Sequence, residues 1–179
     1  MRYNYNIFVN QYPVVVNFIQ HLAYYRAIKS AYDRLAMPSP FWTATIDAHI
    51  MIASVSWCKV FGSYGPNPIH WTKTPVVDVQ KLQGLFRAQL LSDVGLHERQ
   101  WTSYHKSVCD FRDKYVAHHD ISFSAPVPDF HIALKVAYVY EMWIRCLLKP
   151  DILDDQPLKT YFEQCLFEAC AVTESAMTA

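Results

Sequence analysis

The stretch PFWTATIDAHIMIASVSWCKVFG, from Pro40 to Gly62, decides the fold class of this chain. Ser39 and Pro40 form a typical helix start, with serine as the N-cap and proline in the first turn. Gly62 is a typical helix end. Between these ends only Asp47 and Lys59 carry a formal charge, and apolar side chains cover most of the circumference. Such a helix is expected at the centre of a bundle.

Further segments along the chain also repeat apolar residues at helical spacing, and proline, glycine or aspartate separates them. Together they predict an all-α bundle of about six helices. The predicted helices cover about residues 13–36, 40–61, 77–93, 97–119, 128–149 and 155 onward. In the third of them, Leu82, Leu85, Phe86 and Leu90 are expected to face the core.

The composition predicts a globular chain, with residues 1–179 as a single helical domain. Hydrophobic residues make up 52% of the chain and charged residues 18%, which excludes a disordered chain. The chain has 4 glycines against 12 tyrosines, 10 phenylalanines and 5 tryptophans. This balance favours packed helices over a turn-rich β fold.

The charge balance limits the possible partners. Sixteen basic and sixteen acidic residues cancel, so the chain lacks the broad basic field of a protein that coats duplex DNA. A small phosphate-binding cleft needs only a few local charges, and a neutral surface favours self-association. No membrane span is expected, because there is no uncharged run of about 18 apolar residues. Five cysteines without a Cys-x-x-Cys pair predict a reducing, cytoplasmic location.

One polar stretch, RDKYVAHH from Arg112 to His119, combines the side chains that phosphoester chemistry needs without a metal. Arginine holds phosphate oxygens in a planar fork, and histidine can give or take a proton near neutral pH. A helix advances about 100° per residue, so Arg112 and His119 would point in nearly the same direction on an uninterrupted helix. His118 instead follows the apolar stripe of that helix.

The same residues also have a purely structural interpretation. Arg112 could pair with Asp47, Asp110 or Asp113 inside the bundle. His118 could be a hydrogen-bonded core histidine or a cation at a helix C-terminus.

Two further features bear on function. Residues 62–75 form a loop rich in proline, and its His70 and Trp71 are expected either to pack back on the bundle or to cover a cleft. Cys109 and His105 stand at helical spacing and could form a nucleophile pair, although a buried thiol is the simpler interpretation. No metal-ligand motif and no glycine-rich phosphate loop occurs, so neither a metal nor a cofactor is expected.

The polar stretch resembles the motif of the HEPN superfamily, in which an arginine and a polar residue are followed, after four to six residues, by a histidine. Arg112, Asp113 and His118 fit this pattern, and His119 also lies at a permitted spacing. The longer sequence FRDKYVAHHD, residues 111–120, is similar to the abortive-infection AbiU-like branch, which has Arg-Asn-Lys-x-x-Ala-His.

The resemblance implies a helical bundle that dimerises with two motifs facing each other. It implies a metal-independent endoribonuclease of a toxin–antitoxin or abortive-infection (phage defence) system, with RNA as substrate and a cognate antitoxin as a further partner. His118 would activate the ribose 2′-OH or protonate the leaving 5′-oxygen. Arg112 would stabilise charge at phosphorus, and Asp113 would orient one of the two. Other HEPN domains are non-catalytic modules for dimerisation or for binding a nucleotide or partner, so this alternative stays open.

Overall fold

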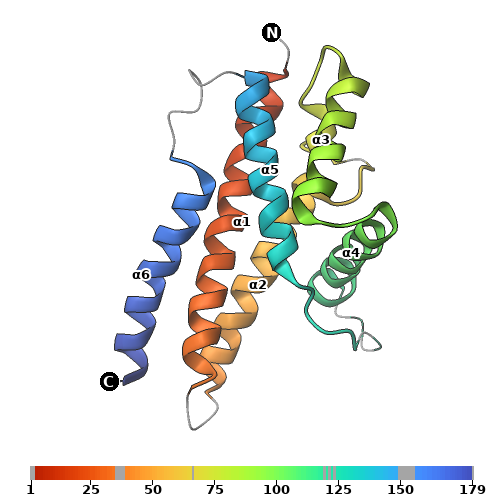
Figure 1. The fold of residues 1–179 in the computed structure, drawn as a ribbon. Coiled ribbons are helices and arrows are strands. Elements are labelled where there is room, and N and C mark those ends of the chain that lie inside the picture. Colours follow the sequence, from red (N-terminus) through yellow and green to blue (C-terminus); the bar gives the residue numbers. More distant parts are fainter. Residues whose placement is uncertain are drawn as a thin grey trace.

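The computed structural model describes residues 3–34, 39–65, 67–118, 120, 122, 124–148 and 156–178. These residues form an all-helical bundle, as predicted (Figure 1). Apart from one isolated bridge between Tyr3 and Pro75, the described part of the chain has no β-structure. The helices are α1 (Tyr5–Tyr32), α2 (Pro40–Phe61), α3 (Val79–Val94), α4 (Glu98–Asp110), α5 (Phe130–Leu148) and α6 (Leu158–Thr178), with a 3-10 turn (Trp71–Lys73) after α2 and a π-helical segment, η2 (Phe111–Ala117), after α4.

Helix α1 begins eight residues before its predicted start at Pro13. The Asn4 side chain accepts a hydrogen bond from the Ile7 backbone N–H at 3.2 Å and so caps the helix. Pro13 is tolerated inside the helix because it is exposed, so that water can bind the Val9 carbonyl that proline leaves without a donor.

The helix with the most extensive packing on two sides is α1, rather than α2 as the apolar circumference of α2 suggests. Helix α1 packs along its length against both α2 and α6 (Figure 1). Phe18, Ile19 and Leu22 on α1 are completely buried. On α2, Trp57 is completely buried, whereas Ile52 is 40% exposed on the outer side. The central position therefore belongs to the first helix of the chain.

The burial of α3 departs from its predicted stripe. Phe86 and Leu90 are buried as expected, but Leu85 is 56% exposed. Helix α3 packs mainly on α5 and has an open side (Figure 1), so a narrower stripe than predicted reaches the core. In α6, by contrast, Leu158 and Phe162 are buried as the pattern predicts.

Gln11, a fully buried polar residue of α1, fastens the loop that follows α2 to the bundle. Its Nε2 donates to the Ile69 carbonyl at 2.8 Å, and its Oε1 accepts from the Thr74 hydroxyl at 2.9 Å and from the Tyr140 hydroxyl. The Trp71 ring lies 4.3 Å from the Phe86 ring, centroid to centroid. This loop therefore packs back on the bundle, the first of the two arrangements expected for it.

Candidate functional site

The chain changes its winding where the predicted motif begins. Helix α4 ends at Asp110, and Phe111–Ala117 continue as a π-helix, in which hydrogen bonds join residues five apart. The prediction of an uninterrupted α-helix over residues 97–119 is therefore wrong in its last two turns. A π-helix turns more slowly per residue, so the angular argument that aligned Arg112 with His119 no longer applies. Such segments occur frequently at functional sites.

The structure brings two of the four predicted site residues together. Arg112 Nε forms an ion pair with Asp113 Oδ1, and the two side chains are 26% and 50% exposed. Of the three carboxylates considered for Arg112, Asp113 is the partner, while Asp110 pairs with two lysines. Arg112 is therefore neither sealed in the core nor fully in solvent. His119 lies outside the described residues.

His118 ends the π-helical segment and is exposed. Its backbone N–H donates to the Asp113 carbonyl at 3.1 Å. Within the described residues no hydrogen bond or ion pair joins its imidazole to Arg112 or Asp113. The interpretation of His118 as a core histidine is wrong, and its position at a helix C-terminus matches the other structural interpretation.

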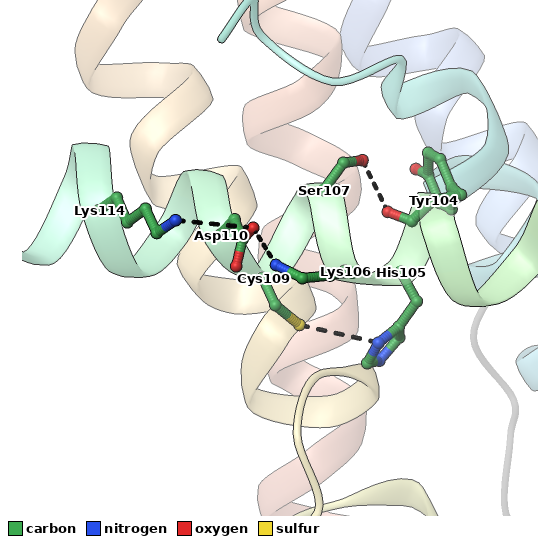
Figure 2. A network of polar contacts seen from close by, with 7 residues as sticks. All are labelled: Tyr104, His105, Lys106, Ser107, Cys109, Asp110 and Lys114. Carbon is green, nitrogen blue, oxygen red and sulfur yellow. Dashed lines mark hydrogen bonds and ion pairs between the residues drawn. The ribbon is translucent and has the colours of Figure 1, made fainter. Parts of the chain in front are cut away.

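Side chains of both charges lie close to the motif in the sequence, and Figure 2 shows three of them, Lys106, Asp110 and Lys114. Asp110 pairs with Lys106, and its Oδ2 lies 3.9 Å from Lys114 Nζ. The region of the motif therefore carries three cations, Arg112, Lys106 and Lys114, and the carboxylates of Asp110 and Asp113. A phosphate group would meet a locally balanced surface and would compete with Asp113 for Arg112.

Aromatic packing fixes the π-helical segment to the core. Phe111 is 2% exposed, and Tyr115 stacks on it with centroids 5.1 Å apart. Tyr104, in the middle of α4, is half-buried, and the centroid of its ring lies 6.0 Å from that of Trp101. Both tyrosines thus pack against aromatic rings of the same chain.

A polar cavity of about 290 Å³ lies beside the first turns of α4 and is lined by histidines from two segments. His105 Nε2 donates to the Phe61 carbonyl at 2.8 Å, and His70 Nε2 donates to the Gly62 carbonyl at 3.1 Å. Carbonyls at a helix C-terminus lack partners within the helix. The two imidazoles act as hydrogen-bond donors to such carbonyls at the end of α2, so the first role of both rings is structural.

The pKa of His70 is lowered to about 4, mainly by burial and also by the charges of His105 and Lys73, while the hydrogen bond to the Gly62 carbonyl opposes the shift. The neutral ring is fully satisfied, because Nδ1 also lies 2.7 Å from the Thr72 hydroxyl. We expect the free energy of unfolding to fall as the pH drops from about 6.5 to about 4, because the unfolded chain takes up a proton that folded His70 does not. The full pKa difference corresponds to about 3.4 kcal/mol, of which about 2 to 3 kcal/mol is lost between pH 6.5 and pH 4. Urea unfolding at several pH values measures this loss.

The matched comparison for this prediction uses two variants. His70→Asn should flatten the dependence between pH 6.5 and 4, whereas His131→Asn, at an exposed position on α5, should leave it unchanged. His21 and His49, with Nδ1 atoms 2.8 Å apart and pKa values also lowered by burial, act in the same direction as His70. The raised pKa of His105 has the opposite effect on the pH dependence. The effect of His70 is therefore measured as the difference in slope between the wild-type protein and each variant. Equal slopes in all three proteins would contradict the prediction.

Below this cavity, two cysteines and His105 form a cluster that joins α2 to α4. Cys109 Sγ lies 3.9 Å from His105 Nδ1 (Figure 2). The Cys58 thiol donates to the Val108 carbonyl, with Sγ 3.9 Å from the oxygen, and it is close enough to Cys109 to lower the pKa of that thiol. The helical spacing predicted the contact between Cys109 and His105, but nothing local in the sequence indicated that Cys58 would join them.

No family model, curated protein or solved structure matches this chain. Among the described residues, no group of three or more His, Cys, Asp or Glu side chains could hold a metal ion. None of the described helices is both long enough and apolar enough to cross a membrane.

Proposed function

We propose that the chain is a HEPN-like endoribonuclease that acts without a metal, within a toxin–antitoxin or abortive-infection system. One observation supports the proposal above others: the motif lies at the surface on a π-helical segment. His118 is exposed, and Arg112 keeps part of its side chain accessible. An arginine sealed in the core with a carboxylate would instead favour a structural role.

In the proposed reaction the RNA supplies its own nucleophile. His118 takes the proton of a ribose 2′-OH or gives a proton to the leaving 5′-oxygen. The 2′-oxygen attacks the adjacent phosphorus, the bond to the 5′-oxygen breaks, and Arg112 stabilises the negative charge that develops. The products carry a 2′,3′-cyclic phosphate and a 5′-OH. Asp113 holds Arg112 through the ion pair and so orients it.

A homodimer is part of this proposal, because within the described part of a single chain no hydrogen bond or ion pair joins the His118 imidazole to Arg112 or Asp113. Two copies meeting at the η2 segments would bring Arg112 of one copy toward His118 of the other. Closed two-fold dimers are the commonest oligomers and place equivalent residues on both sides of the interface. The proposed site would then be built from two chains.

A non-catalytic module for dimerisation or partner binding remains the second proposal, and one observation favours it. Arg112 is already paired with Asp113, so the positive charge is partly neutralised before any phosphate arrives. A module of this kind would bind RNA weakly and would not cleave it.

We expect cleavage to require the ribose 2′-OH and to persist in EDTA, because the proposed nucleophile belongs to the substrate and the proposed acting groups are protein side chains. The measurement compares a labelled RNA with the same strand carrying one 2′-deoxyribose at the cleavage position, each with and without EDTA. Product ends are then identified by mass spectrometry. Cleavage of the deoxy position, or loss in EDTA with rescue by magnesium, would rule out the proposed mechanism. No cleavage of any RNA by the dimer would favour the non-catalytic module.

A further inference from the structure

The cluster of Cys58, Cys109 and His105 has the arrangement of a reactive thiol with its base and a second thiol beside it. His105 is held in one orientation, because Nε2 donates to the Phe61 carbonyl. That bond leaves Nδ1 directed at Cys109 Sγ, 3.9 Å away (Figure 2). Nδ1 can therefore accept the proton of the Cys109 thiol, and the pair becomes a thiolate and an imidazolium.

Of the two thiols, Cys109 is the one that ionises. The hydrogen bond from Cys58 lowers the pKa of Cys109; burial opposes this, and His105 and Ser63 add to the lowering. The same hydrogen bond raises the pKa of Cys58, as does burial. Burial disfavours the His105 cation, but Cys109 and the carbonyls of Phe61 and Gly62 outweigh it and raise the pKa of His105. The shifts thus agree with the geometry.

Access to the sulfur is narrow. Cys109 is 7% exposed and Cys58 is 2% exposed. His105 and Ser63, both beside Cys109, line the cavity of about 290 Å³ described above. Cys109 itself does not line the cavity, so a small oxidant has to pass between His105 and Ser63 to reach the sulfur, and a bulky electrophile cannot follow without local opening.

We propose that Cys109 is a site of oxidation by small hydroperoxides and that Cys58 resolves the product into a disulfide between α2 and α4. This proposal does not depend on the ribonuclease activity. The Cys109 thiolate attacks one oxygen of hydrogen peroxide, the O–O bond breaks, and the released hydroxide takes the proton of His105 to form water. Cys109 is then a sulfenic acid, oxidised by two electrons.

In the second step the Cys58 sulfur attacks Cys109 Sγ and the S–O bond breaks. The Cys58 proton goes to the leaving hydroxide, so that a second water is released. The disulfide would link α2 to α4 close to the motif. Arg112 of the motif is near enough for its positive charge to favour the Cys58 thiolate. Thiol reductants would reverse the bond.

The test uses the native full chain, hydrogen peroxide and peptide mapping over time, with the exposed Cys146 as an internal reference. We expect a Cys58–Cys109 cross-link, with its rate changing less than about twofold between pH 8 and 6, because a thiolate already formed gains little from base. An exposed thiol below its pKa loses about tenfold in thiolate per pH unit, so Cys146 oxidation should slow over the same range.

Two variants separate the steps. Cys58→Ala should leave Cys109 as a sulfenic acid, with no cross-link. Dimedone traps this sulfenic acid once the protein is unfolded. His105→Gln, which can still donate to the Phe61 carbonyl, should make Cys109 oxidation fall with pH as Cys146 oxidation does. If wild-type Cys109 slows in parallel with Cys146, or if no Cys58–Cys109 cross-link forms, the proposal is overturned, whether or not either variant folds.

Discussion

Alanine at His118 is expected to slow RNA cleavage by about 100- to 10,000-fold, the range for removing a general acid or base. Alanine at Arg112 should slow it by about 100- to 1,000-fold, because a donor to the developing charge is lost. Both proteins should stay folded, since His118 is exposed and the Arg112–Asp113 pair is partly exposed. Breaking such a pair costs about 1 kcal/mol or less. Single-turnover cleavage and thermal unfolding measure the two quantities.

Matched controls come from the same helical region. Arg99→Ala replaces an exposed arginine on α4, and His131→Ala replaces an exposed histidine on α5; both should keep wild-type cleavage. His119→Ala is the further comparison, because the resemblance permits either histidine. If His119→Ala is inactive while His118→Ala retains activity, the assignment of His118 is wrong.

Mixing the two inactive variants tests the composite site. In a heterodimer of Arg112→Ala and His118→Ala chains, one of the two sites receives Arg112 and His118 from intact positions, provided that they come from different copies. Equal mixing after unfolding and refolding should therefore restore about a quarter of wild-type activity, since about half of the dimers are mixed and each has one complete site. A site built within one chain would give no restoration, which would contradict the dimer arrangement while leaving the ribonuclease proposal standing.

The helical bundle could be predicted because apolar periodicity and helix-ending residues are local signals. The predicted ends failed where another local signal was stronger. Pro13 suggested a helix start, whereas Asn4 provides the actual cap. The centre of the bundle was misplaced because an apolar circumference shows what a helix can bury, and only the packing of the other helices decides what it does bury. Ile52 and Leu85 are exposed for this reason.

The candidate site was predictable in its residues but not in its geometry. Residues 111–117 contain no glycine or proline that would indicate a departure from α-helical winding, so the π-helix and the direction of His118 could not be inferred. The Cys109–His105 contact follows from spacing within one helix. Its third member, Cys58, comes from another helix, and nothing local brings residues 51 positions apart together. Gln11 was missed for the same reason, because its partners all lie far along the chain.

Gln11→Leu is expected to produce the largest loss of stability among single substitutions that preserve side-chain size. Leucine leaves the Ile69 carbonyl without its donor and the Thr74 and Tyr140 hydroxyls without their acceptor, and Thr74 and Tyr140 are both 0% exposed. Each buried polar group left unsatisfied costs about 1 to 3 kcal/mol, so the total is about 4 kcal/mol, or roughly 10 °C in Tm.

Gln89→Leu on the surface of α3 is the control and should change stability by less than about 0.5 kcal/mol. Adding Tyr140→Phe to Gln11→Leu should recover part of the loss, because removing both partners leaves fewer unpaired groups. Urea unfolding of the four proteins decides the matter: a loss below about 1 kcal/mol for Gln11→Leu, or no recovery in the double variant, would show that Gln11 does not hold the loop to the bundle in the way the hydrogen bonds indicate.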